Sequence, residues 1–218
     1  GRPSLRTSPA NPPPPQILAI GSSTGGPNAL AQVIRDLGDD WPLPVVVTQH
    51  MPPKFTAMLA QRLDKLTALE VKEAEDGDAL QPGRVLVAKG DYHLTFVNEG
   101  SAIYARLSKT APEHSCRPAV DVMLRSLMSI YGNRILAVIL TGMGQDGCAS
   151  SAALYQRGGR VIVQDAETSV VWGMPGAVAA AGIADQVLPV HAIGRAAWST
   201  LRPPPRSVAP ATLQEMTR

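Results

Sequence analysis

Short apolar runs alternate along this chain with segments whose apolar residues recur every three or four positions. Three such runs cover residues 16–21, 44–48 and 135–140, and the segments of helical period that follow them cover residues 27–37, 53–66 and 149–156. Continuous apolar runs are typical of buried parallel strands, and the longer period is typical of amphipathic helices. The alternation predicts an α/β fold with a doubly wound, mostly parallel sheet flanked by helices.

The middle of the chain departs from this alternation. Residues 85–88, 92–97 and 102–105 form short apolar runs, and the last two are separated by a turn that contains Asn98 and Gly100. Two short runs joined by such a turn indicate an antiparallel hairpin. The alternation then resumes with one strand and three helices, expected at residues 161–163 and at 119–128, 175–181 and 191–201.

The length and the proline content divide the chain into one domain and two tails. With 218 residues, 44% of them hydrophobic, the chain can fill one large core. Residues 1–15 are rich in proline and are expected to form an extended linker or tail, residues 16–201 the domain, and residues 202–218 a second tail. A stiff segment at the start suggests that another domain precedes Gly1, although a disordered natural terminus is an alternative.

Composition argues against several partners. The net charge is +2 and aromatic residues make up 4%, so neither a basic surface for nucleic acid nor a platform for stacking bases is evident. No window approaches the roughly 18 apolar residues that cross a bilayer, and no signal peptide is visible. We therefore expect a cytoplasmic protein without membrane insertion. The two cysteines, Cys116 and Cys148, have no metal-ligand spacing, so no metal site is expected.

Three chemically useful side chains follow the three apolar runs. Ser23 comes after the first run, His50 after the second and Asp146 after the third. Open parallel sheets bind ligands outside the carboxyl ends of their strands, so these residues are expected to meet at one edge. A serine nucleophile needs an imidazole to take its proton and a carboxylate to orient that imidazole. The sequence predicts these roles for Ser23, His50 and Asp146 respectively.

Glycines beside these residues predict an oxyanion hole. Gly25 and Gly26 allow a tight turn after Ser23, and the helix that follows directs its amide end toward the same place. A second glycine-rich turn spans residues 141–147, and the backbone N–H of Met143 is the donor that we expect to complete the hole.

Each residue also has a less specific interpretation. Ser23 and Asp146 could each cap a helix, and His50 could be a histidine with a structural role in the core. Taken together these alternatives are weaker, because two helix caps and a core histidine would have no reason to lie at the ends of three strands. His93 and His114 are expected to be structural or exposed, as is His191.

Two other classes of α/β protein match less well. The segment 21–26 follows a strand as a phosphate-binding loop does, but it fits neither G-x-G-x-x-G nor G-x-x-x-x-G-K-[ST]. The second strand also ends in His50, where a dinucleotide fold has an acidic residue. The G-x-S-x-G motif of α/β-hydrolases is absent, and the order serine, histidine, aspartate differs from theirs.

Five segments together resemble one known family, the chemotaxis protein-glutamate methylesterases (CheB), in their catalytic domain. They read IGSSTGG, TQHMP, KEAEDG, RPAVD and LTGMGQDG, at residues 20–26, 48–52, 72–77, 117–121 and 140–147. The resemblance runs in the same order from about residue 17 to about residue 188. The resemblance implies that residues 16–201 form a methylesterase catalytic domain.

The resemblance implies a doubly wound α/β domain that hydrolyses glutamate methyl esters on the cytoplasmic helices of chemoreceptors and releases methanol. It also implies deamidation of receptor glutamines in some members. Ser23 would be the nucleophile, with Thr24 and Met143 near the site, and no metal or organic cofactor is expected. An N-terminal receiver domain that covers the site is a further implied partner.

The chain departs from the family pattern at two positions and offers a second hydroxyl. Gln145 stands where Asn is common, Cys116 stands where some relatives have His, and Ser22 adjoins Ser23. Two alternative functions stay open: a catalytically idle, receptor-binding adaptor domain, and the same hydrolase in a signalling pathway other than chemotaxis.

Overall fold

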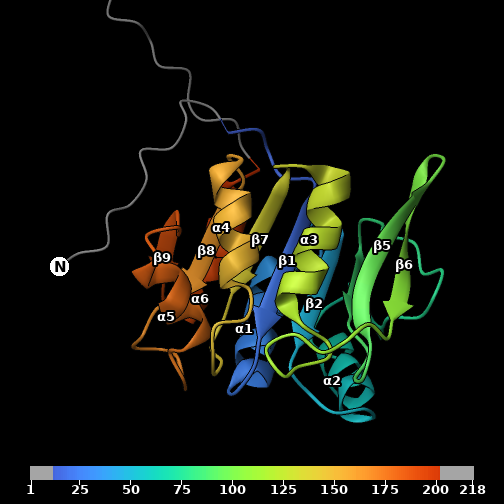
Figure 1. The fold of residues 1–218 in the computed structure, drawn as a ribbon, viewed down its shortest axis with the longest axis horizontal. Helices are drawn as coiled ribbons and strands as arrows, with labels where there is room; N and C mark the ends of the chain where they lie inside the picture. The colour runs from blue at the N-terminus through green and yellow to red at the C-terminus, as the bar shows by residue number, and fades with distance from the viewer. Residues whose placement is uncertain (1–11, 202–218) are drawn as a thin grey trace, which may run out of the picture.

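The computed structural model describes residues 12–201, and a parallel sheet forms its centre (Figure 1). The order of the seven strands is β3-β4-β2-β1-β7-β8-β9. The strands in this sheet are β1 (Ile17–Ser22), β2 (Val45–Gln49), β3 (Glu70–Glu73), β4 (Arg84–Val87), β7 (Ile135–Ile139), β8 (Arg160–Gln164) and β9 (Gln186–Leu188). All of their pairings are parallel.

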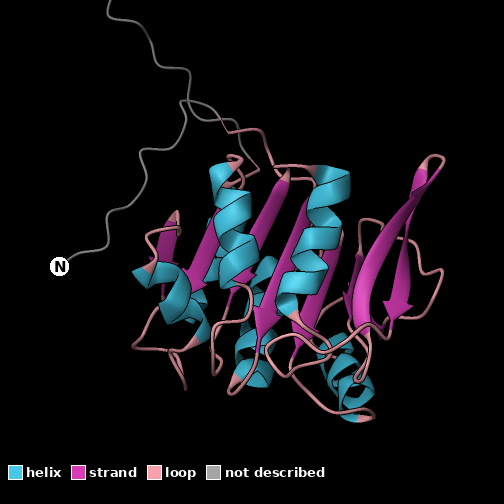
Figure 2. Ribbon diagram, in the orientation of Figure 1, coloured by secondary structure: helices cyan, strands magenta, loops and turns pink. Residues whose placement is uncertain are grey.

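Helices cover both faces of the sheet, as Figure 2 shows. The helices are α1 (Gly26–Leu37), α2 (Phe55–Asp64), α3 (Val120–Tyr131), α4 (Cys148–Gln156), α5 (Met174–Ala180) and α6 (Val190–Ser199). Successive residues of β1 point to opposite faces. Leu18 and Ile20 pack in the core formed with α1, α2 and α6, whereas Ile17 and Ala19 pack in the core formed with α3, α4 and α5. The predicted doubly wound α/β fold is confirmed.

The predicted hairpin is also present. Strands β5 (His93–Glu99) and β6 (Ala102–Ser108) pair antiparallel and form a separate two-stranded sheet. Strand β5 packs against α3, and in Figure 1 the hairpin stands at one side of the molecule. Leu94, Phe96 and Ala105 face the core on the α3 side of the main sheet.

Two edge strands of the main sheet were not predicted, and a third strand lies in a different sheet from the one expected. Strands β3 and β9 were not expected, and β4, which was grouped with the hairpin, pairs in parallel with β2 in the main sheet. Val71 is the one buried residue of β3, and the residues of β9 are all partly exposed. Short strands at a sheet edge therefore carry little hydrophobic pattern.

The strand order places three strand ends side by side. Strand β1 lies between β2 and β7, with Ser22 opposite Gln49 and Gly21 opposite Ile139. The chain leaves β1 toward β2 on one side and returns to β7 on the other, so the order of strands reverses at β1. Ligands of open α/β sheets bind at such a reversal.

The predicted linker and tail lie mostly outside the residues that the structure describes. Residues 12–15 of the predicted linker lie in no helix or strand, whereas residues 1–11 and the predicted tail at 202–218 lie outside the described residues. None of the helices within 12–201 combines the length and the apolar character that a bilayer span requires.

Candidate active site

The predicted site residues lie in the loops that leave three adjacent strands. Ser23 directly follows β1, His50 directly follows β2, and Asp146 lies between β7 and α4. The backbone N–H of His50 donates to the carbonyl of Ser22 over 3.0 Å, and the N–H of Ser23 donates to the carbonyl of Thr141, also over 3.0 Å. These bonds join the strand ends at one edge of the sheet, as predicted.

His50 and Asp146 form a direct pair. Nε2 of His50 lies 2.7 Å from Oδ2 of Asp146, and the two side chains are 11% and 1% exposed. The Asp146 carboxylate also accepts the backbone N–H groups of Val120, at 2.7 Å, and Asp121, at 2.9 Å, at the start of α3. Burial acts to raise the pKa of Asp146, but the bonds from His50 and these amides hold the pKa below its usual value. An ionised carboxylate only accepts, so Nε2 of His50 carries the proton.

The second ring nitrogen of His50 faces a cysteine rather than the serine. Nδ1 lies 3.5 Å from Sγ of Cys116, and within residues 12–201 no hydrogen bond joins the Ser23 hydroxyl to His50. Proton transfer from Ser23 would thus require its hydroxyl to approach Nδ1. Catalytic hydrogen bonds are often long or unformed without substrate, so this arrangement is compatible with a serine nucleophile.

Ser22 and Ser23 have different environments. The Ser22 side chain is fully buried and donates to Oε1 of Gln49 over 2.6 Å, whereas Ser23 is partly exposed. Nε2 of Gln49 donates to the carbonyl of Ser23 over 2.8 Å and to that of His50 over 3.2 Å. Ser22 is therefore committed to holding Gln49. Sequence reasoning missed Gln49, whose signal is an amide at the end of an otherwise apolar strand.

The helix-cap interpretation of Ser23 is wrong, and that of Asp146 holds for a different helix. The N-cap of α1 is Gly25, at φ 81°, and no side chain caps that helix. Gly147 is the N-cap of α4, also without a side-chain cap. Asp146 instead accepts the first amides of α3, a helix that begins 26 residues before it in the chain. Its carboxylate thus meets the positive end of that helix dipole.

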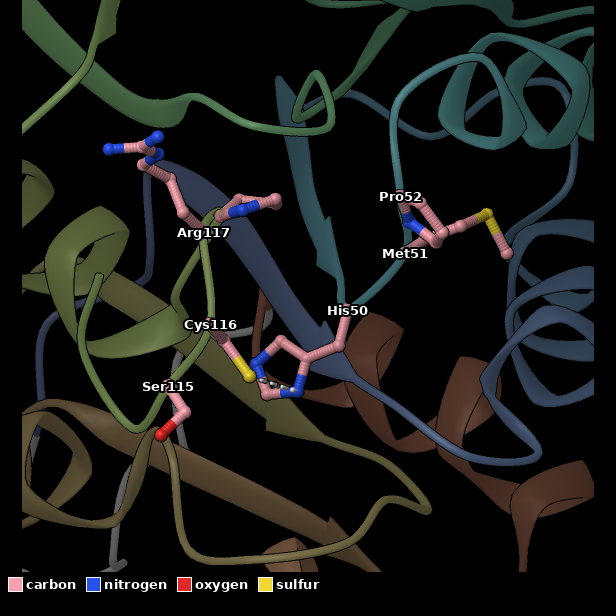
Figure 3. A pocket seen from close by; sticks show the side chains of 7 residues that line it. His50, Met51, Pro52, Ser115, Cys116 and Arg117 are labelled. Atoms are coloured by element: carbon pink, nitrogen blue, oxygen red, sulfur yellow. Dashed lines mark hydrogen bonds between the residues drawn. The ribbon is translucent and has the colours of Figure 1, made fainter. Parts of the chain in front are cut away.

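A cavity of about 340 Å³ adjoins His50 (Figure 3). It is lined by His50, Met51, Pro52, Ser115, Cys116, Arg117 and Pro118. Figure 3 shows the Cys116 sulfur and the His50 ring pointing toward one another, whereas the Arg117 guanidinium points away from the ring. The cavity gives solutes access to the imidazole.

Comparison with known proteins places the chain. A family model described as CheB methylesterase matches residues 18–197. The chain belongs to the CheB methylesterase family.

Two curated members and one solved structure illustrate the similarity. The chain is 51% identical over 183 residues to "Protein-glutamate methylesterase/protein-glutamine glutaminase 1" of Paramagnetospirillum magneticum, covering 84% of this chain and 48% of that protein. It is 48% identical over 176 residues to the protein-glutamate methylesterase/protein-glutamine glutaminase of Trichodesmium erythraeum, covering 81% and 50%. The crystal structure of the Thermotoga maritima CheB methylesterase catalytic domain matches with TM-score 0.83 and 45% identity, covering 85% of this chain and 98% of that one. The chain thus spans about half the length of these two curated relatives.

Three further predicted residues of this CheB family member lie at the same edge. Thr24 and Met143 are exposed, Met143 to 67%, and Gly25 is the N-cap of α1. The carbonyl of Thr24 accepts the Thr141 hydroxyl over 2.9 Å, so the turn after Ser23 is tied to the end of β7. The two turns that were expected to supply oxyanion donors therefore lie together. Thr141 was not singled out in the sequence analysis.

One group of side chains could offer ligands to a metal ion. His114, Asp121 and Asp146 have ligand atoms within 4.8 Å of one another. Nε2 of His114 donates to Oδ2 of Asp121 over 2.7 Å, and Oδ1 of Asp121 accepts the N–H of Ser150 over 2.8 Å. These atoms already hydrogen-bond within the protein, so the group holds α3, α4 and the Asp146 loop together.

The remaining two histidines have the expected character. His93 is buried: its Nε2 donates to the carbonyl of Ala111 over 3.0 Å, and its Nδ1 accepts the N–H of Ala119 over 3.1 Å. His191 is exposed on α6. His93 is therefore structural, and it holds both ends of the loop that carries Cys116.

Proposed function

We propose that this chain hydrolyses γ-methyl esters of glutamate side chains in proteins, with Ser23 as nucleophile, His50 as base and Asp146 as its partner. The observation that carries the proposal is the pair of His50 and Asp146, 2.7 Å apart, beside the partly exposed Ser23 in a member of the CheB methylesterase family. The proposed substrates are the methylated cytoplasmic helices of chemoreceptors. The names of the curated relatives extend the proposal to deamidation of glutamine.

The chemistry follows from the proton on Nε2. Oγ of Ser23 attacks the ester carbonyl carbon while its proton passes to Nδ1 of His50, and the ionised Asp146 stabilises the imidazolium. The tetrahedral intermediate collapses, the C–O bond to the methoxy group breaks, and Nδ1 returns the proton so that methanol leaves. Water then gives a proton to Nδ1 and attacks the acyl-enzyme, which releases glutamate and restores Ser23. With a glutamine substrate the same steps release ammonia.

The negative oxygen of the intermediate needs fixed donors. The proposal assigns this role to the backbone N–H groups of Thr24 and Gly25, in the turn that leads into α1, and to the N–H of Met143. The N–H of Gly26 already donates to the carbonyl of Ser23. A donor of this kind is typically worth about 3–4 kcal/mol in the transition state. The glycine at 142 supports the assignment, because it lets the Met143 turn approach Ser23 closely.

The exposed apolar side chains support a protein substrate. The large hydrophobic side chains exposed within residues 12–201 are Phe55, Met58, Met143, Val170 and Trp172. All five belong to segments that follow the carboxyl ends of β2, β7 and β8, the edge that carries the proposed site. Exposed methionine and aromatic side chains are typical of protein contact surfaces. A substrate side chain held on a helix would cross this edge to reach Ser23.

The proposal includes a regulatory partner. The chain covers 48% of the Paramagnetospirillum relative and 50% of the Trichodesmium relative, so each has a second half that this chain does not match. We assign an N-terminal receiver domain to that half, joined through the proline-rich segment, and we place the enzyme in the cytoplasm.

Release of methanol from methylated receptor cytoplasmic fragments tests the proposal. The wild-type chain is expected to release methanol and Ser23→Ala is expected to release none at the same concentration. Binding of the fragments without release by either protein would instead support the adaptor function. Release from other protein methyl esters but not from receptor fragments would retain the hydrolase and change its pathway.

A further inference from the structure

Cys116 lies in a loop that is closed on itself. The N–H of Glu113 donates to the carbonyl of Cys116 over 3.0 Å, and the N–H of Cys116 donates back to the carbonyl of Glu113 over 2.8 Å. His114 and Ser115, between them, adopt left-handed φ values of 52° and 60°, which residues with a Cβ rarely adopt. This turn specifies the direction in which the Cys116 side chain leaves the backbone.

Side chains attach this loop to its surroundings. Nη2 and Nε of Arg117 donate to Oδ1 of Asp91 over 2.6 and 3.1 Å, and His93 binds the backbone at Ala111 and Ala119. The Arg117 guanidinium, and then the Lys109 ammonium, hold the pKa of Asp91 below its usual range, so the pair is ionised at neutral pH. With the bond from His114 to Asp121, the loop is held on both sides of Cys116.

The loop directs Sγ of Cys116 toward Nδ1 of His50, the ring nitrogen that does not face Asp146. Sγ lies 3.5 Å from Nδ1, within the wall of the 340 Å³ cavity. Burial raises the pKa of the Cys116 thiol, and the negative charge of Asp146 raises it further. The group therefore remains S–H at neutral pH. Nδ1 has a lone pair when Nε2 carries the proton, so the thiol donates and the imidazole accepts.

We propose that Cys116 is a positioning residue for His50, whose thiol holds the imidazole with Nε2 on Asp146 and keeps Nδ1 occupied until the Ser23 hydroxyl replaces it. The role assigned to His50 rests on the proposed function. Cys116 acts only through His50 and does not contact substrate.

A thiol suits this role because it is a weak donor. A strong donor on Nδ1 would compete with the Ser23 hydroxyl, and without any donor the ring would have a partner on one side only. The cavity beside it would then leave Nδ1 open to water and leave the ring free to turn. Nothing else in residues 12–201 hydrogen-bonds Nδ1 of His50.

Three variants of the full 218-residue chain distinguish the hydrogen bond that Cys116 donates from the space that its side chain fills. Cys116→Ser keeps a donor, Cys116→Val fills the space without one, and Cys148→Ser is the matched control because Cys148 is the other cysteine and lies on α4. Methanol release from methylated receptor fragments gives kcat and KM. Ring ¹⁵N spectra of His50 report which nitrogen carries the proton and whether the ring holds one orientation.

The expected result is a selective loss in kcat. Cys116→Val lowers kcat by about tenfold or more with an unchanged KM, as a misplaced catalytic group does. Cys116→Ser is expected to recover only part of that rate, because its hydroxyl holds the ring but competes more strongly with Ser23 for Nδ1, and Cys148→Ser is expected to match wild type. The His50 ring signals should be single in wild type and broadened or doubled in Cys116→Val.

Three outcomes would overturn the inference. Cys116→Val with wild-type kcat would show that the thiol has no role. Equal losses in Cys116→Val and Cys116→Ser with a raised KM would make it a substrate contact, and retained activity in Ser23→Ala with none in Cys116→Ser would make it the nucleophile. A wild-type chain that releases no methanol contradicts the proposed function instead, and the His50 spectra then still decide whether Cys116 holds the ring.

Discussion

Gly142 lies so close to Ser23 that a Cβ atom on the glycine would fall 2.7 Å from the Cβ of Ser23 and 2.9 Å from its backbone nitrogen. It would also fall 2.5 Å from the sulfur of Met174. Real Cβ atoms do not approach other atoms this closely, so a side chain at 142 must displace its neighbours. The absence of a side chain at this position therefore fixes how near Ser23 can lie to the β7 loop.

Gly142→Ala should move Ser23 and reduce the rate more than the stability. A displacement of about 1 Å at a catalytic group can cost about 10²-fold in rate, whereas crowding costs about 1–3 kcal/mol of unfolding free energy. Methanol release and urea unfolding measure the two effects. Gly38→Ala is the control: Gly38 has φ 75° with open space around it, so it should lose stability alone. Equal rates for Gly142→Ala and wild type would contradict the close approach.

Ser23→Ala and Ser22→Ala should differ by orders of magnitude. Loss of the nucleophile in enzymes of this type costs on the order of 10⁶ in rate. Ser22→Ala removes the donor to Gln49 and leaves a buried acceptor unsatisfied, at about 1–3 kcal/mol of stability. Its rate loss should be far smaller, because Gln49 still holds the backbone of Ser23 and His50. A dead Ser22→Ala with an active Ser23→Ala would identify the other hydroxyl as the nucleophile.

The central strands and their ends could be predicted from the sequence because burial on both faces leaves a strong pattern. Strands β1, β2 and β7 are buried along their whole length and mostly apolar, and each is followed closely by a polar site residue. Strands β3 and β9 pair on one side only and bury little, so their sequences resemble loops. These segments are strands because they pair with β4 and β8 at the sheet edges, and not because of their composition.

The sequence was enough to predict which residues meet in the site. It was not enough to predict which of their atoms face one another. Strand ends determine that His50 and Asp146 converge, since parallel strands share an edge. Which ring nitrogen meets Asp146 depends on the rotamer of His50, and the approach of Cys116 depends on a loop closed by Glu113 and anchored by Arg117. These contacts join residues far apart in sequence and have no local pattern.

Asp146→Asn should retain the fold of the site but remove the charge that stabilises the His50 imidazolium. Oδ2 of Asp146 accepts both His50 and the amide of Val120, whereas Oδ1 accepts the amide of Asp121. The asparagine oxygen keeps two of these bonds when it takes the place of Oδ2, and its NH₂ group then faces the Asp121 amide. The same change has cost about 10⁴-fold in rate in a Ser-His-Asp enzyme. Residual methanol release above that of Ser23→Ala is therefore expected, and ¹⁵N spectra of the ring check that Nε2 keeps the proton.

Acid should remove the contribution of Asp146 to stability. The folded-state pKa of Asp146 lies below its unfolded value of about 3.9, so its stabilising contribution is complete above that value and is lost as the pH falls through the folded pKa. Urea unfolding of wild type and Asp146→Asn from pH 7 to pH 2 measures this directly. Their difference in unfolding free energy should be constant near neutral pH and shrink in the acid range. A difference independent of pH would contradict the lowered pKa.

Asp146 and Cys116 should each keep one protonation state between pH 5 and 8. The lowered pKa of Asp146 keeps its carboxylate ionised in this range, and the raised pKa of Cys116 keeps its side chain a thiol. Neither group should therefore add a step of its own to the pH dependence of the rate. Methanol release from pH 5 to pH 8, measured where the chemical step limits the rate, compares wild type with Cys116→Ser. The two profiles should have the same shape, and a step that is present in wild type and absent from Cys116→Ser would show that the thiol titrates in this range.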